Sequence, residues 1–97
     1  MVYLQATMKV KAGKLPEFIS LFNRLIPVLG KRGWKLVGSY RHVVGLGLNT
    51  IVDLWELPDA NSLATVLSDP NPDPLTIQIR ELTENGTAVL MTKLPIE

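Results

Sequence analysis

Changes in the spacing of apolar residues constrain the fold of this 97-residue chain more than any other feature. From Val2 to Val10, apolar residues alternate with polar ones, which is typical of a strand that is buried on one face. From Leu15 to Leu29 they recur at intervals of three and four residues, which predicts an amphipathic helix over about residues 14–31. A chain of this length forms a single domain, residues 1–97, because chains usually divide only beyond about 200 residues.

The second half of the chain predicts a hairpin followed by an interrupted helical region. Residues 34–44 and 50–57 are rich in β-forming side chains, and the loop between them contains Gly45 and Gly47. A helical pattern over about residues 59–84 is broken by the prolines at 70–74, because proline has no backbone donor for a helix. Residues 87–94 then read as a last strand.

The predicted order is strand, helix, strand, strand, helix, strand. With right-handed crossovers, this order gives an α+β fold: a ferredoxin-like βαββαβ antiparallel sheet with its helices on one face. We expect the other face to carry Tyr3, Tyr40, Ile51 and Trp55. A soluble monomer seldom exposes a large apolar patch, so we predict a two-fold homodimer in which two sheets pack face to face.

Composition narrows the possible partners. Apolar residues make up 46% of the chain and charged residues 20%, as in an ordinary globular protein. Residues 1–52 carry eight Lys/Arg and one acid, but these cations are scattered and no nucleic-acid-binding motif accompanies them, so we expect no nucleic-acid partner. No stretch is long and uncharged enough to span a membrane and no secretory signal is evident, so we expect a cytoplasmic protein with no membrane contact.

The hairpin holds the one arrangement that could carry chemistry. If Val44 pairs with Ile51, then His42 faces Asp53 on the neighbouring strand. A carboxylate beside an imidazole raises the pKa of the histidine and fixes its tautomer, so His42 could act as a general base oriented by Asp53. The alternative is a cross-strand polar pair with no catalytic role.

The same pairing would place Tyr40 opposite Trp55, and together with Tyr3 these rings could bind a flat hydrophobic substrate. The alternative role of Trp55 is that of a packing anchor, which is the more usual role of a buried tryptophan. A single histidine and no cysteine provide no protein-only metal site of three or four ligands, and we expect no cofactor.

Three segments resemble the NIPSNAP family: residues 13–18 (GKLPEF), 35–38 (KLVG) and, most specifically, 48–56 (LNTIVDLWE). The resemblance implies the dimeric α/β-barrel fold, in which two ferredoxin-like sheets close into a shared barrel. This chain has Asp53 where the family often has histidine, and its own histidine is at position 42.

Three functions remain open at this stage. The first is a binding protein that holds a small hydrophobic molecule in the barrel lumen without catalysis. The second is a cofactor-independent monooxygenase or isomerase acting on an aromatic or polyketide-like substrate, with His42 and Asp53 as base and orienting group. The third is a haem-binding relative with His42 as axial ligand.

Overall fold

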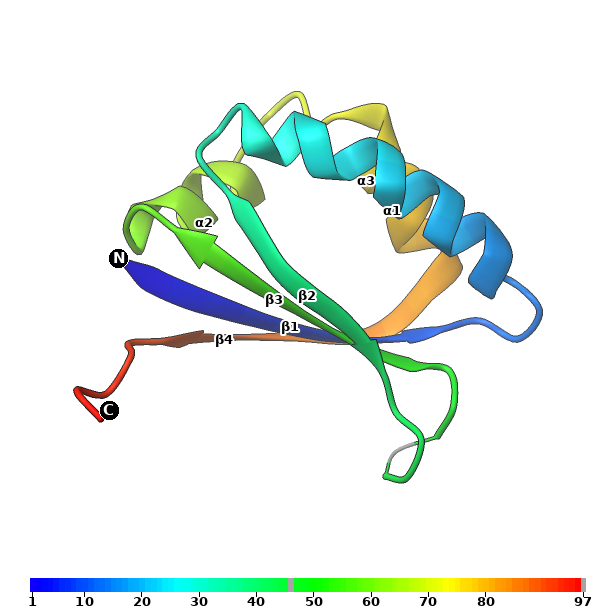
Figure 1. Ribbon diagram of the computed structural model, residues 1–97. Coiled ribbons are helices and arrows are strands. Elements are labelled where there is room, and N and C mark those ends of the chain that lie inside the picture. Colours follow the sequence, from blue (N-terminus) through cyan, green and yellow to red (C-terminus); the bar gives the residue numbers. More distant parts are fainter. Residues whose placement is uncertain (46, 97) are drawn as a thin grey trace.

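The computed structural model describes residues 1–45 and 47–96, within which the chain forms a four-stranded antiparallel sheet with three helices on one face (Figure 1). Leu46, in the predicted hairpin loop, lies outside the described residues. The strands lie in the order β2-β3-β1-β4, which confirms the ferredoxin-like topology. Their bounds are β1 (Val2–Val10), β2 (Lys35–Arg41), β3 (Thr50–Leu57) and β4 (Thr83–Met91).

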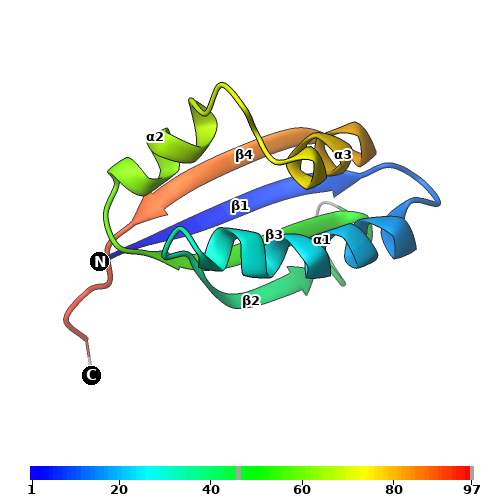
Figure 2. The same cartoon turned by 90° about the horizontal axis from the view of Figure 1, so that it is seen from above.

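The helices are α1 (Leu15–Gly30), α2 (Asn61–Leu67) and α3 (Pro74–Leu82). Helix α1 lies along the β2–β3 side of the sheet, and α2 and α3 lie toward β1 and β4 (Figure 2). The predicted break at the prolines is confirmed, and α3 begins there because the Asp73 side chain accepts a hydrogen bond of 2.8 Å from the Leu75 amide. These helices leave the opposite face of the sheet uncovered.

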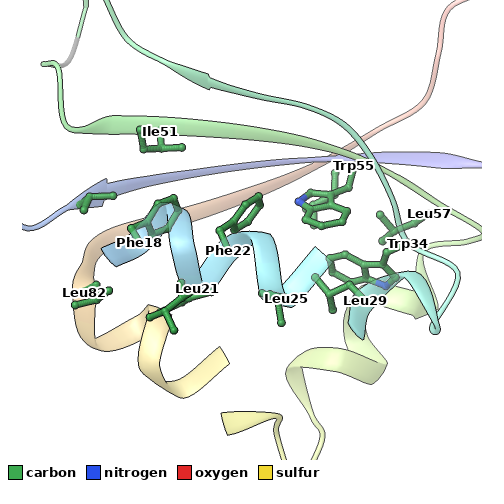
Figure 3. Close-up of a cluster of buried hydrophobic side chains, with 13 residues drawn as sticks. Phe18, Leu21, Phe22, Leu25, Leu29, Trp34, Ile51, Trp55, Leu57 and Leu82 are labelled. Atoms are coloured by element: carbon green, nitrogen blue, oxygen red, sulfur yellow. The ribbon is translucent and has the colours of Figure 1, made fainter. Parts of the chain in front are cut away.

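The core lies between α1 and the central strands. The residues of α1 that face the sheet follow the predicted spacing, and the buried residues of β3 alternate with half-buried ones. Figure 3 shows the side chains of α1 directed toward those of β3. The buried hydrophobic residues are Leu4, Val10, Phe18, Leu21, Phe22, Leu25, Leu29, Trp34, Ile51, Trp55, Leu57, Ile79 and Leu82.

The prediction that Ile51 and Trp55 lie on the uncovered face is wrong. They are only 5% and 2% exposed, and they pair with Met8 and Leu4 on the face that the helices cover. Strand β3 is apolar on both faces, so alternation alone does not decide which set is inward. Packing decides which set faces inward, because burying Ile51, Trp55 and Leu57 against α1 removes more apolar area from water than burying the smaller residues on the other face of β3.

The last strand begins at Thr83 rather than near residue 87, and it ends at Met91. Gly86, which follows the predicted helical region, lies inside this strand. Beside it, Asn85 has φ of 55°, and the pairing with β1 shifts register between Thr7 and Lys9. Thr83, directly after α3, is already extended with φ of −125° and ψ of 159°, so no loop separates the two elements. The left-handed Asn85 belongs to a bulge further along the strand.

Candidate functional site

A cavity of about 350 Å³ lies between α1 and strand β2. We call it the α1–β2 cavity. Because β2 is an edge strand, the cavity is reached from solvent along that edge. Most of its lining is apolar. The lining residues are Leu15, Phe18, Ile19, Phe22, Asn23 and Ile26 of α1, with Leu36, Ser39, Tyr40, Arg41 and Ile51 of the sheet.

Ser39 is one of the polar residues that line this cavity, and it lies opposite Asp53 in the β2–β3 pairing. The Ser39 hydroxyl donates a hydrogen bond of 2.6 Å to Oδ1 of Asp53. Asp53 is 1% exposed, and this burial raises its pKa to about 6, although the Ser39 hydrogen bond acts to lower it. A carboxylate of this kind exchanges its proton near neutral pH, and Ser39 connects it to the cavity.

Arg41 provides the positive charge of the lining. It pairs with Ile51, so it lies on the same face of the sheet as Ser39, and its Nε donates a hydrogen bond to the Leu48 carbonyl. Among the residues that the structure describes, no carboxylate forms an ion pair with Arg41. The cavity therefore combines mostly apolar walls with one cationic group, and the buried acid Asp53 lies behind Ser39.

The predicted pairing of His42 with Asp53 is wrong. The His42 amide donates instead to the Thr50 carbonyl at 3.0 Å, so the register differs by three residues from the one expected. A shift by an odd number moves a residue to the other face of a sheet, so Ser39 takes the place opposite Asp53. His42 lies at the end of the hairpin, where its ring is next to Gly45, and it does not line the α1–β2 cavity.

The three predicted ligand-binding rings do not meet at one site. Tyr40 lines the α1–β2 cavity, whereas Tyr3 lines a more open hollow of about 430 Å³ on the uncovered face, together with Leu54 and Met91. Trp55 lies in the core, with ring centroids 5.9 Å from Phe22 and 5.6 Å from Trp34 (Figure 3). Its structural role is that of a packing anchor.

Sequence reasoning missed Ser39 and Arg41 as cavity residues because it paired Val44 with Ile51, whereas the partner of Ile51 is Arg41. Strand β2 also contains an irregularity that the sequence analysis did not identify. The pairing with β3 shifts between Leu36 and Gly38, so one extra residue is accommodated there. Gly38 is the sequence signal for this one-residue irregularity, since a glycine inside a strand pattern often marks a bulge. A Cβ at this position would overlap the hydroxyl of Tyr40, which lies over it.

No protein-family model matches this chain, and no curated protein matches it either. Solved structures do. An uncharacterized NIPSNAP domain protein from Burkholderia xenovorans superposes with a TM-score of 0.76 at 23% identity, covering 98% of this chain and 96% of that one. A NIPSNAP family protein with unknown function from Agrobacterium tumefaciens has a TM-score of 0.74 at 25% identity, covering 94% of this chain and 86% of the other.

The chain has the fold of the NIPSNAP proteins. This confirms the resemblance seen in the sequence. An antibiotic biosynthesis monooxygenase is also similar to this NIPSNAP-like chain, with a TM-score of 0.71 at 20% identity, covering 98% of this chain and all of that one (100%). At that identity the likeness concerns the fold alone.

Two other kinds of site are not found in the part of the chain that the structure describes. Across residues 1–45 and 47–96, no group of three or more His, Cys, Asp or Glu side chains could hold a metal ion. In those same ranges, no helix is long and apolar enough to cross a membrane.

Proposed function

We propose that this NIPSNAP-like protein binds a small, flat hydrophobic molecule in the α1–β2 cavity. The observation that carries the proposal is a mostly apolar cavity of about 350 Å³ with a few polar groups, which include Ser39 and Arg41 on β2 and Asn23 on α1. Cavities of roughly 300–1,000 Å³ with mostly apolar walls and a few placed polar groups are typical of small-molecule sites.

The sequence analysis expects the ligand in the barrel lumen, whereas the α1–β2 cavity lies on the helix-covered side of the sheet. The lumen would be formed by the uncovered face, but Asp53 and Trp55 lie on the other face. The hollow on the uncovered face is lined by Tyr3, Leu54 and Glu56 and is more open to solvent. The α1–β2 cavity better matches a site that removes most of a ligand's surface from water.

Filling the cavity tests this proposal. Ile19 is 50% exposed at the cavity, so Ile19→Trp should occupy part of it without disturbing the core. Ile77 on α3 is 45% exposed and does not line the cavity, so Ile77→Trp is the matched control. We expect 2-naphthamide to bind the wild type and the control in calorimetry and to bind Ile19→Trp at least tenfold more weakly. Equal binding to all three proteins would refute the proposed location.

A second candidate function is a cofactor-independent monooxygenase or isomerase, and the Ser39–Asp53 pair favours it. A substrate proton could pass to the Ser39 oxygen while Ser39 gives its own proton to Asp53, leaving a substrate carbanion. An isomerase would return the proton at another carbon. A monooxygenase would use dioxygen, with one oxygen atom entering the substrate and the other leaving as water with two substrate hydrogens. A pKa of about 6 suits this role for Asp53 at neutral pH.

Oxygen consumption with an anthrone substrate tests the enzymatic candidate. We expect the rate to rise with pH through about 6, since the base acts only when ionised. Asp53→Asn should abolish turnover, whereas His42→Asn should retain it, because His42 lies outside the cavity. Full activity in Asp53→Asn, or loss in His42→Asn alone, would contradict the assignment.

We also propose that the uncovered sheet face forms a two-fold homodimer. In the single chain this face leaves Val37 and Val89 49% and 52% exposed. Val37 lines the hollow together with Tyr3, Leu54 and Met91. The surface therefore keeps the apolar character that motivated the dimer, although Ile51 and Trp55 do not contribute to it. A second copy of the same face supplies a matching apolar partner.

A further inference from the structure

We infer that the ligand of the α1–β2 cavity is an aromatic acid: a flat apolar body with one polar edge, which carries a carboxylate toward Arg41 and a hydroxyl toward Ser39. This inference rests on the proposed function, and it names the class of molecule that the same cavity selects. It is carried by the charge of Arg41, by the hydrogen-bonding state of Ser39 and by their common position on β2.

The positive charge of Arg41 favours an anionic group on the ligand. Arg41 is the charged residue of a lining that is otherwise apolar or uncharged, and within the described ranges neither of the ion pairs involves it. Asp53 forms no ion pair with it, since neither ion pair within the described ranges includes Asp53. The Nε bond to the Leu48 carbonyl orients the guanidinium and leaves its two terminal NH2 groups for another acceptor. A planar guanidinium with free donors is well suited to a carboxylate.

The hydroxyl of Ser39 favours a hydrogen-bond donor on the ligand. A serine hydroxyl has one proton, and the proton of Ser39 is given to Asp53. Toward the cavity the Ser39 oxygen therefore presents lone pairs, which accept a hydrogen bond but cannot donate one. A hydroxyl or N–H group of the ligand satisfies this oxygen, whereas a carbonyl does not.

The two groups lie on one edge of the cavity. Ser39 and Arg41 are two residues apart on β2 and face the same side of the sheet, which separates their Cα atoms by about 6–7 Å. The opposite wall, formed by α1, is apolar except for Asn23 and includes Phe18 and Phe22. A ring system that carries both polar groups along one edge can meet β2 with that edge and α1 with its apolar remainder.

Calorimetry on the full chain at pH 8 tests the anion requirement. The probes are 2-naphthoate and 2-naphthamide, which differ mainly in charge. We expect the wild type to bind the acid about tenfold more tightly, since hydrogen bonds to charged groups are among the stronger ones and Arg41 is partly screened by water. Arg41→Gln should remove the preference. Lys35→Gln, on the same strand but outside the cavity lining, should keep it.

The possible results separate this inference from the proposed function. If the amide binds and the acid binds no more tightly, the anion assignment is overturned while the cavity remains a binding site. If neither probe binds, the proposed function fails and the inference fails with it. If Arg41→Gln keeps the preference for the acid, Arg41 is not the anchor and the inference is overturned.

A third probe, 4-hydroxy-2-naphthoate, tests the Ser39 end. We expect its hydroxyl to improve binding to the wild type severalfold over 2-naphthoate and to give no gain in Ser39→Ala. Ser39→Thr keeps the hydroxyl and should keep the gain, which separates the loss of an acceptor from a change in folding. A gain that persists in Ser39→Ala would overturn the donor requirement.

Discussion

At the scale of single residues, Asp53 links the stability of this protein to pH. Burial raises its pKa from the ordinary value of 3.8 to about 6. Between these two values the folded state binds a proton more tightly than the unfolded state, so the free energy of unfolding falls as pH rises from about 4 to 6. The shift corresponds to about 3 kcal/mol, which is a large part of the stability of a small domain.

Replacing the carboxyl should remove this cost. Asp53→Asn keeps a group that can accept from Ser39 but does not ionise, so we expect it to raise the free energy of unfolding at pH 8 by about 1–3 kcal/mol. Urea unfolding of both proteins from pH 4 to pH 8 would show it. We expect the wild type to lose stability over this range relative to the variant. Parallel curves would mean that Asp53 titrates normally.

Trp55 tests which face of the sheet is the core. It is 2% exposed beneath α1, so Trp55→Ala should cost about 3–5 kcal/mol of folding free energy. Tyr3 is on the uncovered face and only half-buried, so Tyr3→Ala should cost distinctly less in a monomer. Urea denaturation at a concentration where the protein is monomeric measures both. Equal losses would contradict the placement of Trp55 on the helix side.

At the scale of elements, the sequence predicts which helices and strands form better than it predicts how the strands pair. The spacing of Leu15, Phe18 and Phe22 can be satisfied only by one helix face, so α1 is found within a residue of its predicted bounds. In the β2–β3 hairpin, no comparable spacing of apolar residues determines which residues pair. The strands pair three residues away from the expected register, so the partner of Asp53 is Ser39 and not His42, whereas the irregularity between Leu36 and Gly38 shifts the register by only one residue. The predicted pair of His42 and Asp53 was wrong because it depended on the register of the β2–β3 hairpin.

The junction of α3 and β4 provides an element-scale prediction. Asn85 has φ of 55°, a conformation that asparagine tolerates and β-branched residues do not. We expect Asn85→Val to lower the free energy of unfolding by about 1–2 kcal/mol and Asn85→Gly to be neutral or slightly stabilising. Thermal unfolding of the two variants decides. If valine is tolerated as well as glycine, the left-handed bulge is not a feature of the fold.

At the scale of the whole molecule, one face of the sheet is covered by helices and the other is open to a partner (Figure 1). Leu54 lines the hollow on the open face, so Leu54→Arg should produce a folded monomer if that face forms the homodimer. Ile77→Arg on α3 is the control and should leave the mass unchanged. Light scattering at micromolar concentration gives the answer. A wild-type protein that is already monomeric would refute the dimer.

The central claim is that the ligand site lies between α1 and β2 and not on the open face. Amide chemical shifts of the 15N-labelled protein, recorded during a titration with 2-naphthoate, test it most directly. We predict the largest changes at Ile19, Asn23 and Ser39, which line the cavity. Changes concentrated at Tyr3, Leu54 and Met91, which line the open-face hollow, would contradict the claim.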